Sequence, residues 1–407
     1  MSQPVVTSLS PETVAIVKAT VPALQTHGSA ITAKMYDRLF RDEHIRSLFN
    51  HANQANGKQI NALAGAILAY ASNIDNLGAL LPAVERIAQK HVGFHILPEH
   101  YPYVATALLG AIGDVLGEAA TEDILNAWGE AYWFLAGILQ NREGALRDAI
   151  TQAPGGWTGW RPFVVSETIR ESSIITSFIL RPADGKPVMH HKPGQYITLR
   201  FDTAGQAGMK RNYSISCAPN GEYYRISVRR AQESQGGSHF MHDHVRIGTT
   251  LEITPPAGDF YLSDNPERPV VLLSGGVGLT PMVSMLETIR QQHPGLPVHY
   301  VHSTMSSQTH AMGSHVQTLA SHLPHSRVST FYSEPAAIDQ PGQNHDVSGM
   351  VSLDWLEQNT PVQDADYYIC GPSGFMRAFV TGLAAKGVPA DRIHYEFFGP
   401  ADEALAA

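Results

Sequence analysis

The spacing of apolar residues changes once along this chain, at the turn-forming segment Ala153-Pro154-Gly155-Gly156-Trp157. Before that segment apolar side chains recur at steps of three and four, as in the run Leu80–His91, and this period is that of a helix with one buried face. No strand-like alternation interrupts residues 1–152, and the last helix is expected from a capping Thr121 to about Leu146. We therefore predict an all-α domain over residues 1–152.

Short alternating runs follow the turn-forming segment. In Tyr224–Val228, Ile226 and Val228 alternate with polar residues, which indicates a half-buried strand. Turn residues separate several such runs at short intervals, as is typical of a small antiparallel barrel. The expected strands are Phe163–Val165, Ile174–Leu180, Tyr196–Phe201, Tyr213–Cys217, Tyr224–Val228 and Leu251–Thr254. We predict an antiparallel β-barrel domain over residues 153–265.

A continuous apolar run, Val270–Leu273, predicts a buried strand that leads into the glycine-rich loop Ser274–Pro281 and then a helix. Glycines between a strand and a helix let the backbone approach a phosphate at the helix N-terminus. The pattern differs from the common Gly-x-Gly-x-x-Gly fingerprint of dinucleotide sites. A second turn of this kind, Cys370–Met376, lies near the end of the chain. With further strands expected at Val298–His302, Arg327–Tyr332 and Tyr367–Cys370, we predict an α/β domain over residues 266–407.

Charge and cysteine content exclude several classes of protein. The formal net charge of the 407 residues is −9 and no basic stripe is present, so we expect no nucleic-acid partner. The two cysteines are too few for a disulfide framework and fit a reducing compartment. We see no signal peptide and no apolar run of about 18 residues. We therefore expect a cytoplasmic protein without a membrane span.

His91 ends one apolar helix face and permits three interpretations. A lone histidine there is most often a partly buried side chain satisfied by a neighbour. With His95 it forms an i, i+4 pair of the kind that binds zinc, but neither a third ligand nor the glutamate of a metalloprotease helix accompanies it. The third interpretation is an axial haem ligand, with two other helices supplying the distal side. Candidates for the distal side are Tyr36, Phe49, Gln59 and Leu63.

The segment Arg211-Asn212-Tyr213-Ser214 offers three groups that a flavin needs. The guanidinium can pair with a pyrophosphate, the phenol ring can lie against the isoalloxazine, and the hydroxyl can bond its polar edge. The plainer interpretation is an ordinary strand with a surface arginine. Gly236-Gly237-Ser238 adds amides and a hydroxyl that suit a pyrophosphate, although a plain glycine loop would have the same sequence. We favour a flavin because haem-like and nucleotide-like features flank these segments.

Several motifs resemble those of the flavohaemoglobins. The helical part resembles the globin domain of that family, and the rest resembles the ferredoxin-reductase superfamily, which binds FAD on a barrel and NAD(P)H on the following α/β domain. The resemblance covers essentially all 407 residues. The motifs that carry it are Leu80–His91, Ala69–Ile74, Asn50–Gly57, Gly275–Pro281, Cys370–Met376 and Tyr395–Pro400.

The resemblance implies roles for individual residues around haem b, FAD, and NADH or NADPH. His91 is expected to be the iron ligand, Tyr36 the distal hydrogen-bond donor, and Gln59 part of the distal lid, while Tyr101 and Glu143 are expected to be partners of the histidine. Met35 departs from the family, in which phenylalanine is common. The cofactor contacts implied are Phe49, Leu63, Lys90, Tyr196, Arg211, Asn212, Tyr213, Ser214, Gly236, Gly237, Ser238, Gly275, Gly276, Val277, Gly278, Leu279, Thr280, Pro281, Cys370, Gly371, Pro372, Glu396, Phe397, Phe398, Gly399 and Pro400.

The activity that the resemblance implies is that of a nitric oxide dioxygenase, with dioxygen and nitric oxide as substrates and a monomer as the expected state. A carboxylate on the far nitrogen of an axial imidazole pushes electron density to iron, which favours activation of dioxygen over its release. Two alternatives stay open: an oxygen or redox sensor, and a general reductase of ferric iron, quinones or lipid peroxides. The choice between NADH and NADPH, and a lipid in the distal pocket, also stay open.

Overall fold

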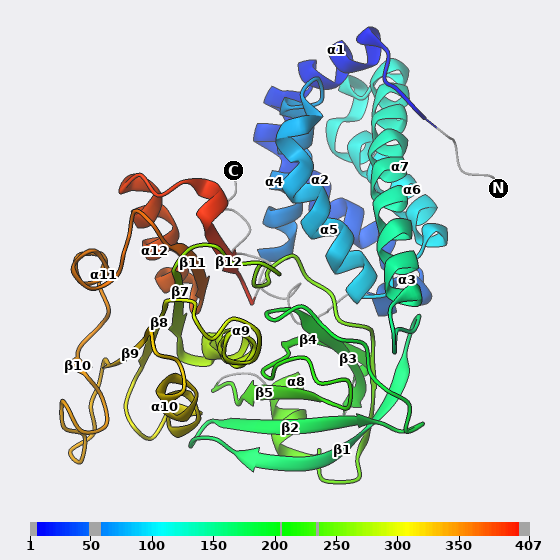
Figure 1. Ribbon diagram of the computed structural model, residues 1–407. Coiled ribbons are helices and arrows are strands. Elements are labelled where there is room, and N and C mark those ends of the chain that lie inside the picture. Colours follow the sequence, from blue (N-terminus) through cyan, green and yellow to red (C-terminus); the bar gives the residue numbers. More distant parts are fainter. Residues whose placement is uncertain (1–5, 49–57, 204–205, 233–235, 399–407) are drawn as a thin grey trace. The chain divides into compact units, whose positions relative to one another are not determined.

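The computed structural model describes residues 6–48, 58–203, 206–232 and 236–398. The chain divides into a mainly helical unit, whose described residues are 6–48, 58–152 and 206–210, and a second, sheet-containing unit formed by Ala153–Thr203 and Arg211–Phe398 (Figure 1). A predicted boundary at residues 265 and 266 lies inside the second unit, so the division of that unit into two domains stays a prediction.

The helical unit contains no strand among its described residues up to Gln152, as predicted. Its first helix begins with a cap, because Ser10 Oγ accepts a hydrogen bond of 3.0 Å from the amide of Thr13. The last helix continues beyond the predicted end at Leu146, since no proline or glycine lies between Leu146 and Pro154. The helices are α1 (Pro11–Ala19), α2 (Val21–Leu39), α3 (Glu43–Leu48), α4 (Lys58–Ser72), α5 (Leu81–Gly93), α6 (Tyr101–Leu116) and α7 (Glu122–Gln152).

Six antiparallel strands form the first sheet, in the order β4-β3-β6-β1-β2-β5. Ile215, just after β4, makes an isolated antiparallel bridge to Ile226 of β5. That bridge joins the two edge strands, so the sheet curls into the predicted barrel. The elements are β1 (Arg161–Arg170), β2 (Ile175–Pro182), β3 (Tyr196–Thr203), β4 (Gln206–Ser214), β5 (Tyr224–Arg229), α8 (Gly237–Asp243) and β6 (Thr250–Ile253).

The predicted strand Tyr213–Cys217 is displaced in the structure. β4 ends at Ser214, because the following residues leave the β3 edge and bond to β5 through Ser216 N and Arg225 O at 2.7 Å. Apolar residues alternate without a break across this bend, so the sequence looks like a single strand. In the structure the residues before the bend pair with β3, and the residues after it bond to β5. The segment Arg211–Ser214 therefore lies at the end of a strand.

A parallel sheet in the order β10-β9-β8-β7-β11-β12 forms the rest of the second unit. Val270 and Leu272 of β7 pack into one buried cluster while Val271 and Leu273 pack into another. Burial on both faces explains the continuous apolar run of this strand. The elements are β7 (Val270–Gly275), α9 (Leu279–Gln292), β8 (Val298–Thr304), α10 (Gly313–Ser321), β9 (Ser326–Tyr332), β10 (Val347–Ser348), α11 (Leu353–Asn359), β11 (Asp366–Cys370), α12 (Ser373–Ala385) and β12 (Ile393–Glu396).

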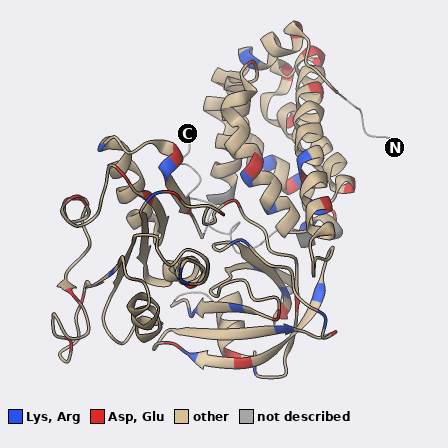
Figure 2. Ribbon diagram, viewed as in Figure 1, with Lys and Arg blue, Asp and Glu red and all other residues tan. Residues whose placement is uncertain are grey.

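Charged residues of both signs are interspersed over the ribbon of each unit (Figure 2). Among the described residues, none of the helices is both long enough and apolar enough to cross a membrane.

Buried histidines are a feature of the second unit. His302 of β8 is 1% exposed and its Nδ1 lies 2.9 Å from Ser274 Oγ. Burial lowers the pKa of His302 to about 3, and burial likewise lowers the pKa of His191 to about 4. Each ring is therefore held in its neutral form in the folded protein.

This burial makes stability depend on pH in a defined direction. An unfolded histidine has a pKa of about 6.5, whereas folded His302 has one of about 3, so the unfolded chain binds more protons between these values. The stabilisation is complete above about pH 6.5 and is lost as the pH falls toward 3. At pH 5.5, unfolding of the parent should take up about one proton more than unfolding of His302→Asn.

Proton uptake during denaturation in weakly buffered solution is the measurement. The control is His325→Asn, because the side chain of His325 is exposed and its ring stays in water in both states. Equal uptake by the parent and His302→Asn would contradict the neutral, buried state of His302.

Candidate functional site

His91 lies in the last turn of α5, and its Nδ1 is fixed by two side chains from other helices. Nδ1 donates to Oε1 of Glu143 at 2.7 Å, and it lies 3.1 Å from the hydroxyl of Tyr101. That hydroxyl in turn donates to the same Oε1 at 2.5 Å. The side chain of Glu143 is 0% exposed. Helices α5, α6 and α7 thus bring together three residues that the resemblance had grouped.

The other carboxylate oxygen of Glu143 also has a partner, which sequence reasoning missed. Arg147, one turn further along α7, places Nη2 3.2 Å from Oε2 and also donates to the backbone carbonyl of Ile96. The i, i+4 spacing of Glu143 and Arg147 could have indicated this pair. Burial, reinforced by the charge of Glu143, raises the pKa of Tyr101 far above its ordinary value. Tyr101 therefore keeps its proton and acts as a donor.

The tautomer of His91 follows from these contacts. With the proton on Nδ1 committed to Glu143, the lone pair of the ring lies on Nε2, for which no partner is recorded among the described residues. The side chain as a whole is 32% exposed. An imidazole that is held through Nδ1 and keeps Nε2 for another partner is the arrangement that a haem ligand needs.

The zinc alternative is not supported. Helix α5 ends at Gly93, and His95 follows it with a left-handed φ of 58°, so the two histidines do not lie one turn apart on a single helix. Within the described part of the chain, no group of three or more His, Cys, Asp and Glu side chains could hold a metal ion.

Two of the distal candidates belong to the core of the helical unit. Tyr36 of α2 is 7% exposed and stacks on Phe40, with ring centroids 5.3 Å apart. Leu63 of α4 packs against the same core, and Met35 is buried within it. Lys90 is half-buried beside His91. Phe49 and the side chain of Gln59 lie outside the described residues.

The flavin candidates gather on β3, on the end of β4 and at the start of α8. A Cβ on Gly237 would lie 2.8 Å from Cγ of Arg211, so the turn before α8 packs directly on that arginine. Burial lowers the pKa of Arg211. The hydroxyl of Tyr196 is buried and has no hydrogen-bond partner in the described structure. Arg211 beside a glycine turn, together with the unsatisfied phenol of Tyr196 on the neighbouring strand β3, is a set of groups that fits FAD.

The other residues of the flavin segments have defined places. The amide oxygen of Asn212 accepts from Thr198 Oγ1 at 2.9 Å, and burial raises the pKa of Tyr213. Ser214 is buried at the end of β4. The hydroxyl of Ser238 accepts from the amide of Ala231 at 3.2 Å, which leaves its proton for donation. Gly236 is the residue that precedes α8.

The two glycine turns of the parallel sheet meet each other. Strands β7 and β11 are neighbours, with Cys370 in register with Ser274. A Cβ on Gly278 would lie 2.1 Å from the carbonyl oxygen of Cys370, and one on Gly371 would lie 3.2 Å from Cα of Gly275. Only glycine fits so close a backbone approach. The loop Gly275–Pro281, including Gly276, Val277, Leu279 and Thr280, and the turn Cys370–Pro372 thus lie together beside the N-terminus of α9.

The C-terminal segment lies near both the flavin candidates and the two glycine turns of the parallel sheet. Glu396 ends β12, in register with Cys370 of β11. Burial is the main cause that raises the pKa values of Tyr196 and Cys370, and the negative charge of Glu396 adds to both shifts. Glu396 therefore lies near one residue from each group. Phe397 is partly buried and Phe398 is 50% exposed, whereas Gly399 and Pro400 lie outside the described residues.

Comparison with known proteins identifies both parts of the chain. A family described as Globin matches residues 33–139, and a family described as Oxidoreductase NAD-binding domain matches residues 272–381. The flavohemoprotein of Xylella fastidiosa (strain 9a5c) is 56% identical over 98% of this chain and 99% of its own. That of Chromobacterium violaceum is 44% identical over 97% and 100%.

Solved structures agree with the sequence comparisons. A crystal structure of flavohemoglobin from Malassezia yamatoensis with bound FAD and heme superposes with a TM-score of 0.86, at 26% identity, over 96% of this chain and 100% of that one. The flavohem-like FAD/NAD binding domain of nitric oxide dioxygenase from Vibrio cholerae has a TM-score of 0.53 at 38% identity, covering 58% of this chain and 97% of that one. The chain therefore belongs to the flavohemoprotein family, and it is accordingly an oxidoreductase that works with haem, FAD and NAD(P)H.

Proposed function

We propose that this flavohemoprotein is a nitric oxide dioxygenase, which converts nitric oxide and dioxygen to nitrate with NAD(P)H as the electron donor. The observation that carries the proposal is the fully buried carboxylate of Glu143, bonded to Nδ1 of His91 at 2.7 Å. Globins that only store or release dioxygen do not need so strong an acceptor behind the ligand. The similarity to a Vibrio cholerae protein that is named a nitric oxide dioxygenase adds support.

When bound, FAD would supply the conversion of a two-electron hydride donor into single electrons, and haem would supply a redox-active iron. The overall reaction balances as two nitric oxide and two dioxygen molecules giving two nitrate ions and a proton while NAD(P)H is oxidised to NAD(P)+. What this chain contributes is position, hydrogen bonding and charge.

In the helical unit, Glu143 fixes the orientation and the tautomer of His91 and makes its Nε2 a stronger donor. Tyr101 shares the same carboxylate oxygen at 2.5 Å, so the imidazole cannot rotate without breaking a network of buried bonds. Tyr36 would donate a hydrogen bond to the oxygen substrate on the distal side. Its stacking on Phe40 at 5.3 Å holds the plane of the phenol.

In the second unit, Arg211 would pair with the pyrophosphate of FAD, and Tyr196 and Ser214 would bond the flavin through their hydroxyls. The N-terminus of α9 and the two glycine turns would hold the pyrophosphate of NAD(P)H. Phe398, which is half exposed, would cover the flavin where the nicotinamide enters. Glu396, close to both Tyr196 and Cys370, would mark the edge where the hydride is transferred.

The setting of the reaction is part of the proposal. Cys217 and Cys370 are free thiols in the structure, which fits a reducing compartment, and NAD(P)H is a reductant of the cytoplasm. We therefore place the protein there, acting as a monomer.

Replacement of His91 tests the ligand assignment. His91→Gly should yield protein that retains FAD but has lost most of its haem, because Nε2 is the group proposed to hold the iron. Added imidazole should restore haem binding by filling the vacated space. The measurement is the Soret absorbance per mole of protein, with the exposed His27 changed to Gln as the control. A parental Soret band in His91→Gly without imidazole would refute the assignment.

Product analysis tests the reaction itself. Purified protein supplied with NADH, nitric oxide and dioxygen should form about two nitrate ions per NADH, one for each electron delivered. Tyr36→Phe should lower turnover roughly tenfold to a hundredfold, because loss of a hydrogen bond to a partly charged oxygen costs about 1.5–3 kcal/mol. Nitrate by ion chromatography and NADH by absorbance give the ratio. NADH oxidation that proceeds without nitrate and ignores nitric oxide would instead indicate a general reductase.

A further inference from the structure

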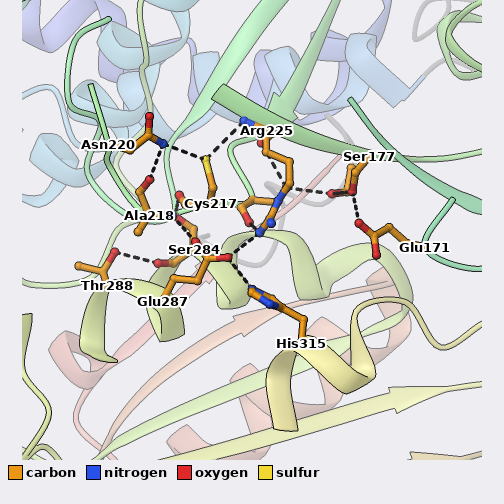
Figure 3. A network of polar contacts seen from close by, with 12 residues as sticks. Glu171, Ser177, Cys217, Ala218, Asn220, Arg225, Ser284, Glu287, Thr288 and His315 are labelled. Carbon is orange, nitrogen blue, oxygen red and sulfur yellow. Dashed lines mark hydrogen bonds and ion pairs between the residues drawn. The ribbon is translucent and has the colours of Figure 1, made fainter. Parts of the chain in front are cut away.

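Helix α9 carries an acidic side chain, Glu287, which contacts the barrel and which the proposed function leaves without a role. The helix begins at the glycine loop Gly275–Pro281, and Glu287 lies in its second half. Figure 3 shows Glu287 and Ser284 of α9 beside His315 of α10 and beside Cys217, Ala218 and Arg225 of the barrel. Glu287 therefore joins the parallel sheet's helices to the barrel.

The carboxylate of Glu287 accepts hydrogen bonds from three directions. Oε2 accepts from the amide of Ala218 at 2.7 Å, and Oε1 accepts from Nη2 of Arg225 at 2.7 Å and from Nε2 of His315 at 2.7 Å. The side chains of Glu287 and Arg225 are 13% and 14% exposed. Burial raises the pKa of Glu287, but these donors together hold it below the ordinary value. A buried carboxylate with this many donors is rigidly placed.

A second contact one turn earlier supports the first. Ser284 Oγ donates to the carbonyl of Cys217 at 2.7 Å, and the same carbonyl accepts from Nε2 of His191 at 2.9 Å. Arg225 is itself tied to the segment, through Nε and the hydroxyl of Ser216 at 3.2 Å. Residues 216–218 are therefore held against α9 by several bonds.

The segment 216–218 begins two residues after Ser214, the last residue of the proposed flavin segment. The other end of the contact, α9, starts at the loop proposed to hold the nicotinamide dinucleotide. Part of α9 thus separates Glu287 from the proposed nicotinamide site, and a few residues of extended chain separate its barrel partners from the proposed flavin segment. Any displacement of α9 against the barrel would change the distance between nicotinamide and flavin.

We propose that Glu287 is a positioning residue for hydride transfer, which fixes α9 on residues 216–218 so that the nicotinamide meets the flavin. The proposal rests on the cofactor sites of the proposed function. The step it serves is the two-electron oxidation of NADH to NAD+ with reduction of FAD. Because a misplacement of about 1 Å can cost on the order of a hundredfold in rate, the contact should affect the rate of transfer more than the affinity for either cofactor.

The test uses holoprotein carrying Glu287→Gln, a change that keeps the volume and removes the charge. Anaerobic stopped-flow measurement at saturating NADH should show the limiting rate of flavin reduction lowered about tenfold to a hundredfold. The Kd for NAD+ and the FAD and haem contents should stay parental. Mixing reduced protein with NAD+ should give a weakened long-wavelength charge-transfer band, which reports the stacking of nicotinamide on flavin. Glu252→Gln is the matched control, because Glu252 pairs with Arg200 at 2.6 Å within the barrel.

A parental limiting rate with a parental charge-transfer band in Glu287→Gln would overturn the proposal. If Glu287→Gln loses FAD, the deciding variant is Ser284→Ala, which removes one hydrogen bond from the same face of α9 with little change in volume. A lowered limiting rate of flavin reduction in Ser284→Ala, with FAD retained, supports the proposal. A parental limiting rate in that variant overturns it. None of these measurements needs nitric oxide, so failure of the dioxygenase assignment would leave them intact. A parent protein whose flavin NADH does not reduce would refute the cofactor sites instead.

Discussion

The carboxylate of Glu143 has no exposure to solvent, and a buried carboxylate is stable only when hydrogen-bond donors meet its oxygens. His91 and Tyr101 meet one oxygen and Arg147 meets the other. This requirement holds α5, α6 and α7 in one arrangement, and it leaves the imidazole with a single orientation and a single tautomer. The orientation of the proposed iron ligand is thus a consequence of satisfying a buried charge.

The second unit applies the same chemistry at Glu287. An arginine, a histidine and a backbone amide surround that carboxylate, as an arginine, a histidine and a tyrosine surround Glu143. In each unit a buried acid gathers donors from distant parts of the chain, 52 residues apart for His91 and Glu143 and 62 apart for Arg225 and Glu287. Such pairs cost desolvation energy, and breaking one leaves a charge unsatisfied, so they specify geometry more than they add stability.

Periodicity predicted the fold class and most elements, because the helical face of Leu80–His91 and the apolar run Val270–Leu273 reflect burial that each segment shows locally. The bend after Ser214 was missed, since alternation continues across two different pairings. The proximal partners of His91 came from family resemblance, because no spacing rule links residues 52 apart. Arg147 and Glu287 were missed for a related reason. Charged residues spaced along a helix look the same in the sequence whether they face solvent or bond to buried groups of other elements.

If NADH, flavin and haem form one path for electrons in a single chain, electrons should reach the flavin before the haem. Anaerobic addition of NADH to the purified holoprotein, followed by rapid-scanning absorbance, tests it most directly. Flavin absorbance should bleach first, and the Soret band should then shift to the ferrous position at a rate independent of protein concentration. Flavin that bleaches while the haem stays ferric, or a Soret shift whose rate rises with protein concentration, would contradict electron transfer along a single chain.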